Sequence, residues 1–237
     1  MKVIVVMPAY NAAKTIQKTF LDIPKGVVNK VLVVDDSSQD ETAKIAKKLG
    51  LEVVVHSQNR GYGANQKTCY TLALSQGADI VVMIHPDYQY DSSLTNELIK
   101  PILKGRFDVM LGSRIRTRKE VLAGGMPLYK YIANRLLTLI ENLILGQNLS
   151  EYHTGFRAYH KNILNKVPFH KYSDSFVFDQ QILIGAICLD ARIGEIPVPV
   201  RYFPEASSIN FQKSLIYGLS IIRDLCFYLI FGKKYFL

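Results

Sequence analysis

The chain has 237 residues, of which 49% are hydrophobic and 21% are charged, and its formal net charge is +9. This composition excludes a disordered chain, and the length suffices for one α/β domain with a substantial core. The positive charge favours an anionic partner, but nucleic acid is the least favoured because the sequence has no long basic run and no alternation of arginine with aromatic residues.

The first half of the chain alternates β-branched runs with amphipathic stretches, which predicts a parallel sheet with crossover helices. Ser38 and Glu41 fit a capping box at the start of the second helix. The predicted strands are residues 2–7, 30–34, 52–56, 80–84 and 108–111, and the predicted helices lie near residues 12–22, 39–49, 63–77 and 93–104.

Polar or turn-forming residues follow the first three predicted strands. They are Pro8, Ala9, Tyr10 and Asn11 after the first, Asp35 and Asp36 after the second, and Asn59, Gly61 and Gly63 after the third. Ligands of such sheets bind beyond the carboxyl ends of the strands. Carboxylates suit ribose hydroxyls, Tyr10 suits a base, and glycines let backbone N–H groups approach phosphate. A nucleotide with a metal-bound diphosphate would use all of these groups.

The fourth strand is followed by a group of possible metal ligands. Alternate residues of an extended chain point to one side, so His85, Asp87 and Gln89 are predicted to face one point. Their oxygens suit Mg²⁺, whereas the imidazole favours a softer ion such as Mn²⁺. The alternative is an ordinary strand end with a polar turn.

The fifth strand is followed by Arg114, which we expect to contact a phosphate. Arg116, Arg118 and Lys119 are better explained by a solvated basic loop. A helix over residues 128–145 follows, and its apolar stripe is expected to pack in the core, with a lipid groove as the less favoured alternative.

These motifs together resemble the family 2 glycosyltransferases, and among them the polyprenyl-phosphate (dolichyl-phosphate) sugar synthases. The resemblance covers roughly residues 1–205 and rests on the motifs at residues 8–12, 34–42, 59–63, 112–114 and 154–157. It implies a GT-A fold: a Rossmann-like, mostly parallel α/β sheet with flanking helices. It also implies a nucleotide-sugar donor, a divalent cation (Mn²⁺ or Mg²⁺) and inversion at the anomeric carbon.

One position departs from the family pattern. The family usually has Asp-x-Asp at the end of the fourth strand, often with Gln two residues later, and here His85 replaces the first Asp. Asp87 and Gln89 match the other two positions. His85 is therefore either a direct metal ligand or a residue that supports the ligands by hydrogen bonding, and the departure leaves open a catalytically degenerate relative.

Two acids are candidates for catalysis. The resemblance assigns Glu151, four residues before Gly155, to the segment that closes on donor and acceptor. Asp179 is the second candidate, although a carboxylate at a helix start is equally explained by the helix dipole. Arg157 could stabilise phosphate charge or tie its loop down.

The last part of the chain divides into three segments. Residues 193–202 are predicted to form an edge strand because of their prolines, with Arg201 meeting phosphates by family resemblance, and residues 203–210 a flexible lid. Residues 214–231 form an apolar helix, but Arg223 and Asp224 at its centre would each cost ~2.5–3.5 kcal/mol in a bilayer, which argues against a spanning helix. It either packs on the domain or lies at a membrane surface. The expected division is one domain over residues 1–210 and a helical extension over residues 211–237.

The sequence therefore predicts an inverting glycosyltransferase that moves a sugar from a nucleoside diphosphate sugar to an acceptor. A polyprenyl phosphate is favoured, since an ionised phosphate needs no strong base, and a glycan hydroxyl is the alternative. Three widely spaced cysteines, Cys69, Cys188 and Cys226, indicate buried thiols in a reducing compartment, which favours a cytoplasmic protein. The apolar C-terminal segment leaves open a peripheral position on the cytoplasmic face of a membrane or next to a membrane subunit.

Overall fold

The structure is a computed structural model that describes residues 1–115, 117–199 and 211–237. Within them, one sheet of seven strands has the order β3-β2-β1-β4-β6-β5-β7. The strands are β1 (Val3–Ala9), β2 (Lys30–Asp35), β3 (Glu52–Val55), β4 (Ile80–Met83), β5 (Val109–Ser113), β6 (Arg157–His160) and β7 (Ile193–Pro197). Strand β6 runs antiparallel to β4 and β5, and the other pairs are parallel. The fold is therefore mixed α/β with a mostly parallel sheet, as predicted.

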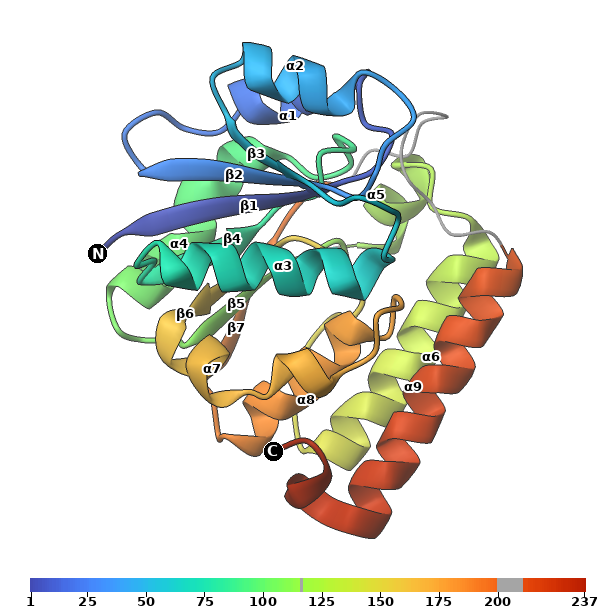
Figure 1. The fold of residues 1–237 in the computed structure, drawn as a ribbon. Helices are drawn as coiled ribbons and strands as arrows, with labels where there is room; N and C mark the ends of the chain where they lie inside the picture. Colours follow the sequence, from blue (N-terminus) through green and yellow to red (C-terminus); the bar gives the residue numbers. More distant parts are fainter. Residues whose placement is uncertain (116, 200–210) are drawn as a thin grey trace.

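Helices cover both faces of this sheet (Figure 1). The α-helices are α1 (Ile16–Leu21), α2 (Thr42–Lys48), α3 (Tyr62–Ser75), α4 (Thr95–Leu103), α5 (Arg118–Ala123), α6 (Leu128–Leu145), α7 (Lys161–Lys166), α8 (Phe178–Cys188) and α9 (Phe211–Phe231). Short 3₁₀ turns are η1 (Ser92–Leu94), η2 (Phe169–Lys171) and η3 (Gly232–Tyr235).

The core has two layers because successive residues of a strand point to opposite faces. In β1, Ile4 and Val6 pack with α3 and α8, whereas Val3, Val5 and Met7 pack with α1, α2 and α4. Both faces of the central strands are buried, as is typical of a parallel sheet between helix layers.

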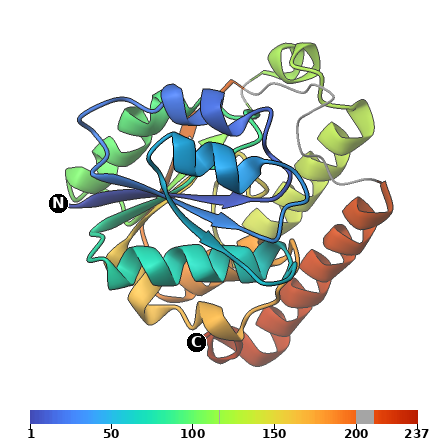
Figure 2. The same cartoon turned by 45° about the horizontal axis from the view of Figure 1, so that its top comes forward.

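Helices α6 and α9 pack against each other to one side of the sheet, and the views of Figures 1 and 2 agree on this. Helix α9 is held to the rest of the protein in its second half, where Ile221 and Leu225 are buried. The fully buried Asp224 accepts a hydrogen bond of 2.8 Å from Gln181 Nε2 of α8. The charge at the centre of this helix therefore has a protein partner.

Residues 212–235 are long and apolar enough to cross a membrane by length and composition, and 17% of the best window is buried in the protein. One such helix is weak evidence for a span, and the contact between Asp224 and Gln181 is lost if α9 leaves α8.

Several sequence expectations are corrected. The capping box is wrong because Glu41 makes no side-chain cap and the Ser38 hydroxyl donates to Asp35 instead. Strand β6 was not predicted. Cys226 is exposed, while Cys69 and Cys188 are buried as expected. Arg116, Arg201 and the predicted lid over residues 203–210 lie outside the described residues.

Candidate functional site

The predicted site lies at the carboxyl ends of β1, β2 and β4. The chain leaves β1 toward β2 on one side and reaches β4 on the other, which makes this edge the point where the strand order reverses. A cavity of about 1130 Å³ opens here and continues between α6 and α9. The predicted residues that border it are Pro8, Ala9, Tyr10, Asp36, Asn59, Gly61, His85, Asp87, Gln89, Arg114 and Asp179. The structure thus brings strand ends far apart in sequence to one ligand-sized space.

Asp36 organises the first polar part of this cavity. Its carboxylate accepts hydrogen bonds of 2.9 Å from the backbone N–H groups of Arg60 and Gly61 and lies 2.7 Å from His56 Nδ1. The Asn59 side chain donates to the Asp36 carbonyl at 3.2 Å. Tyr10 is 53% exposed above this region, which leaves its ring face open to a flat ligand.

The two glycines serve protein packing in this structure. The Gly63 N–H donates to the Asp174 carbonyl at 2.8 Å, and the Gly61 N–H donates to the Asp36 carboxylate. A Cβ at Gly63 would lie 2.4 Å from the Ser173 carbonyl oxygen. The expectation that these N–H groups face a phosphate is therefore not supported, since the Gly61 N–H binds Asp36 and the Gly63 N–H binds the loop at Asp174, a contact that no local sequence pattern indicates.

Asn11 and Asp35 lie just beside the cavity and join the first two loops. The Asn11 backbone N–H donates to the Ser38 hydroxyl at 2.9 Å, and Asn11 Oδ1 accepts from the Gln39 N–H at 2.8 Å. The Asp35 carboxylate accepts from the Ser38 N–H at 3.0 Å. Their contacts shape the loop that carries Asp36.

His85, Asp87 and Gln89 all border the cavity, but not as an extended chain. Strand β4 ends at Met83, and the backbone then turns, with Tyr88 at a φ of 61°. The extended geometry predicted for these three residues is therefore wrong, although all three border the same cavity. The Gln89 N–H donates to Asp87 Oδ1 at 3.1 Å, which fixes the carboxylate.

The chemistry of these side chains fits a metal ion that is held partly by the protein and partly by the phosphates of a substrate. Within the described part of the chain, no group of three or more His, Cys, Asp or Glu side chains could hold a metal ion alone. Mg²⁺ and similar ions are usually held by one or two carboxylates together with substrate phosphates and water. Asp87, with Gln89 and His85 beside it, provides such a partial set.

Tyr62 and Gln66, which sequence reasoning missed, connect this wall to Asp179. The Tyr62 hydroxyl lies 2.9 Å from His85 Nε2 and donates to Asp179 Oδ2 at 2.6 Å. Gln66 Nε2 donates to Asp179 Oδ1 at 2.9 Å. Burial and the Asp179 charge raise the pKa of Tyr62 well above its ordinary value, so it keeps its proton. Burial lowers the pKa of His85, which makes the ring neutral at pH 7.

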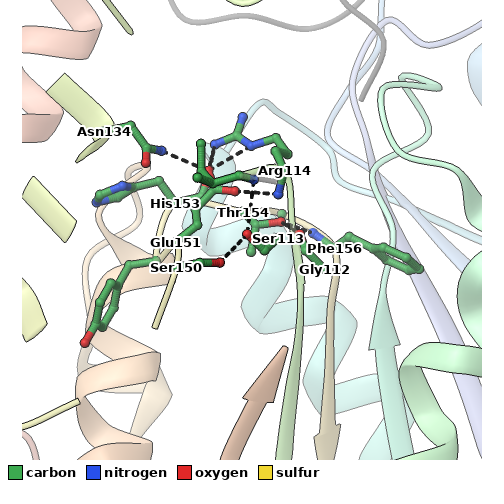
Figure 3. A network of polar contacts seen from close by, with 12 residues as sticks. Gly112, Ser113, Arg114, Asn134, Ser150, Glu151, His153, Thr154 and Phe156 are labelled. Atoms are coloured by element: carbon green, nitrogen blue, oxygen red, sulfur yellow. Dashed lines mark hydrogen bonds and ion pairs between the residues drawn. The ribbon is translucent and has the colours of Figure 1, made fainter. Parts of the chain in front are cut away.

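The second acid, Glu151, forms a buried ion pair with Arg114 (Figure 3). Its carboxylate accepts from the Arg114 backbone N–H at 2.8 Å, from Arg114 Nε at 2.9 Å and from Asn134 at 2.9 Å. Burial alone would raise the pKa of Glu151, but the Arg114 charge and these hydrogen bonds outweigh it and hold the pKa below its ordinary value. Glu151 is fully buried, so of the two acids only Asp179 borders the cavity.

Arg157 is fully buried below the site. Its guanidinium donates to the carbonyl oxygens of Thr154 at 2.6 Å, Tyr152 at 2.8 Å and Asp179 at 2.6 Å. These contacts are those of a residue that ties its loop down, which was one of the two roles expected. A phosphate could not reach the guanidinium in this arrangement.

The far end of the cavity is apolar, whereas the sequence favoured a core role over a lipid groove for the α6 stripe. Leu136 and Leu137 of α6 and Leu215, Leu219 and Ile222 of α9 border it. Leu136 is 57% exposed and Leu219 is 62% exposed. A ligand with one polar and one apolar end would match the whole cavity.

Comparison with known proteins agrees with this geometry. Residues 4–167 match the model of glycosyl transferase family 2. An uncharacterised protein of Methanocaldococcus jannaschii is 30% identical over 97% of this chain and 93% of its own. The UDP-N-acetylglucosamine–dolichyl-phosphate N-acetylglucosaminyltransferase of Methanococcus voltae is 29% identical over 83% of this chain and 84% of its own.

The fold is also that of a solved structure, glucosyl-3-phosphoglycerate synthase from Mycobacterium tuberculosis, in a complex with Mn²⁺, UDP-glucose and phosphoglyceric acid. The two chains superpose with a TM-score of 0.72 at 22% identity, over 94% of this chain and 78% of the other. On the family match over most of its length, the chain belongs to glycosyl transferase family 2.

Proposed function

We propose that this protein transfers a sugar, with inversion, from a nucleoside diphosphate sugar to a polyprenyl phosphate. The observation that carries the proposal is the single cavity with a polar end at the strand ends and an apolar end between α6 and α9. A polyprenyl phosphate has the same division between a charged head and a hydrocarbon chain. The relative from Methanococcus voltae, whose name includes dolichyl phosphate, supports this choice.

The donor occupies the polar end in this proposal. Asp36 and Asn59 border the cavity where ribose hydroxyls would lie, and Tyr10 offers a ring face to the base. Asp87, Gln89 and His85 would hold a divalent cation. Such an ion would neutralise negative charge on the departing diphosphate. The Mn²⁺ in the solved relative is in line with such an ion.

The acceptor phosphate lies next to the cations of the cavity wall. Arg114, Lys130 and Lys213 border the same cavity as the strand ends and the leucines of α6 and α9. Preorganised positive charge stabilises phosphate oxygens without reorganisation during the reaction. Arg201, outside the described residues, remains a proposed further contact.

The two acids support a phosphate acceptor over a hydroxyl. A hydroxyl acceptor needs a general base. Glu151 is buried and paired with Arg114, and both oxygens of Asp179 already accept hydrogen bonds from Tyr62 and Gln66. Neither carboxylate is arranged as a ready proton acceptor, whereas an ionised phosphate requires none.

Attachment at the cytoplasmic face of a membrane follows from this acceptor. Besides the cavity wall, α6 exposes Leu143 at 75% and α9 exposes Ile230 at 69%. Exposed apolar side chains on two helices that pack together favour an interaction site. We propose that it lies at the bilayer surface, with α9 in the interface and its Asp224 still bound to Gln181.

The test is a donor panel followed by a transfer assay. UDP-, GDP-, CDP- and dTDP-linked sugars, each with Mn²⁺ or Mg²⁺, are screened for a rise in melting temperature, since ligands that bind only the folded state stabilise it. The stabilising donor is then assayed with polyprenyl phosphate in detergent. We expect transfer, with an inverted anomeric product.

Asp87→Ala is expected to lower the turnover on the order of 10²–10³-fold while its melting temperature without ligand stays unchanged. Asp22→Ala, a substitution at a carboxylate outside the cavity that accepts from Tyr88, is the matched control. Full activity of the Asp87 variant would refute the metal assignment, and absence of both binding and transfer in the wild type would refute the proposed function.

A further inference from the structure

Tyr62 connects two residues that the sequence places far apart. Its hydroxyl lies 2.9 Å from His85 Nε2 and 2.6 Å from Asp179 Oδ2. The rings of Tyr62 and His85 are also stacked, with centroids 5.2 Å apart and an interplanar angle of 17°. His85 is therefore held both at one nitrogen and at its face.

The direction of these hydrogen bonds determines which nitrogen of His85 carries the proton. A phenol has one proton to donate. Tyr62 donates it to Asp179 Oδ2, and the other oxygen of this carboxylate accepts from Gln66. The Tyr62 oxygen can then only accept from His85, so Nε2 carries the hydrogen. In a neutral imidazole this leaves Nδ1 with a free lone pair.

Gly155 fixes the side of the ring that faces the protein. A Cβ at this position would lie 2.5 Å from His85 Cδ2 and 2.8 Å from Nε2, so only glycine lets the ring sit this deep. Nδ1 is on the opposite edge. In residues 1–115, 117–199 and 211–237, no protein group forms a hydrogen bond with Nδ1, and His85 borders the same cavity as Asp87.

We propose that Tyr62, held by Asp179, is a positioning residue that fixes His85 in the tautomer with hydrogen on Nε2, so that Nδ1 serves as a nitrogen ligand for the cation beside Asp87. The inference rests on the proposed function for the presence of that cation. A nitrogen ligand at Nδ1 makes the site selective among metal ions, because imidazole favours first-row transition ions such as Mn²⁺ and Co²⁺ while Mg²⁺ prefers oxygen ligands. Asp179 thereby acts through Tyr62 on the metal site.

The first measurement is the tautomer itself, by two-bond ¹⁵N–¹H correlation spectra of protein labelled at histidine, without metal or donor. His85→Asn assigns the His85 signals. We expect a protonated Nε2 and an unprotonated Nδ1 in the wild type, and a mixture of tautomers in Tyr62→Phe. Tyr152→Phe is the matched control because it removes another phenol, which donates to Asn142 at 2.9 Å, without touching His85.

The second measurement is metal selectivity, read from Mn²⁺ binding by electron paramagnetic resonance in the presence of the donor nucleotide and from competition by Mg²⁺. Loss of a residue that orients a metal ligand costs 10–100-fold in metal affinity. We expect Tyr62→Phe to lose at least about tenfold in Mn²⁺ affinity with a smaller change for Mg²⁺, and His85→Asp to reverse the preference toward Mg²⁺.

The inference is overturned if the wild-type ring carries hydrogen on Nδ1, if Tyr62→Phe leaves the tautomer unchanged, or if Mn²⁺ selectivity survives in both variants. None of these results touches the proposed function, which the transfer assay decides by itself. Conversely, absence of transfer would leave the tautomer measurement intact.

Discussion

The two ends of the cavity are built in different ways. At the polar end, polar side chains in and beneath the cavity wall are held by protein partners: Asp36 by two backbone N–H groups, Glu151 by Arg114, and His85 by Tyr62. At the apolar end, leucines of two helices stand open to solvent, such as Leu136 at 57% and Leu219 at 62% exposed. A preorganised site needs the first arrangement, while binding of a flexible hydrocarbon chain needs only the second.

We expect substitutions at the polar end to lower the stability of the fold or the sugar transfer, and substitutions at the apolar end to weaken binding to a membrane. The largest effect is expected at Arg157, which supports the polar end from below. Arg157→Met removes the guanidinium donors to the carbonyl oxygens of Tyr152, Thr154 and Asp179. We expect a loss of about 3–5 kcal/mol in the free energy of unfolding, measured by urea denaturation, because each buried acceptor that loses its donor costs about 1–3 kcal/mol.

Arg192→Met is the control for this prediction, because its salt bridge to Asp108 has a 55% exposed arginine side chain. Exposed pairs contribute about 0–1 kcal/mol. Equal losses in the two variants would contradict the assignment of Arg157 as an internal support.

The apolar end is tested next by Leu143→Asp and Ile230→Asp. Each of these side chains is exposed in the free protein, so its burial in a membrane would contribute about 1.5–3 kcal/mol. We expect each substitution to weaken sedimentation with lipid vesicles by about tenfold or more, while turnover of a short-chain, water-soluble polyprenyl phosphate is preserved.

Leu21→Asp is the matched control for attachment, since Leu21 is 59% exposed on α1, among the helices of the other sheet face. If vesicle binding of this variant falls as much as that of Leu143→Asp, the apolar face of α6 and α9 is not the membrane surface.

Gly155→Ala tests how tightly the polar end is packed. The added methyl group would meet the His85 ring at 2.5 Å, so the ring must move. We expect a loss of about 1–3 kcal/mol in stability and weaker metal binding. Gly50→Ala serves as a comparison without a steric clash, because nothing lies within 4 Å of its added Cβ. Any loss of stability in this variant reports only the backbone φ of +75°. Unchanged metal binding in Gly155→Ala would contradict the fixed position of His85.

The smallest effect is the pH dependence that Glu151 contributes. Its pKa is lower in the folded protein than in the unfolded chain, so its contribution to stability is fully present above about pH 4.5 and is lost as the pH falls through the folded pKa. We expect the stability difference between wild type and Glu151→Gln to shrink as the pH falls below this point, measured by urea denaturation at each pH. A difference that grows on acidification would contradict the ion pair with Arg114.

Local sequence patterns were enough for every strand of the described sheet except β6 and for the position of the cavity. β-Branched runs marked β1, β2, β4 and β5, and the residues after them do converge. Helix α6 was predicted with its observed bounds, Leu128–Leu145. Strand β6 was not predicted because its four residues are too few to show a clear strand periodicity. Its place between β4 and β5 is set by pairing partners far along the chain.

Long-range contacts account for the rest of the site. Tyr62 and Asp179 are 117 residues apart in sequence, and no spacing rule connects them. The N–H of Gly63 was expected to face a phosphate, and it binds Asp174 because the loop before α8 folds over the start of α3. Arg157 was expected either at a phosphate or in its loop, and only the folded environment distinguishes these roles.

The most direct test of the account is a competition between acceptors in one reaction with the stabilising donor and metal. Polyprenyl phosphate, the corresponding polyprenol and a soluble oligosaccharide are supplied at equal concentration, and the products are separated by mass spectrometry. We expect sugar on the phosphate alone, since neither Glu151 nor Asp179 is arranged to deprotonate a hydroxyl. Transfer to the polyprenol or to the oligosaccharide in preference to the phosphate would contradict it.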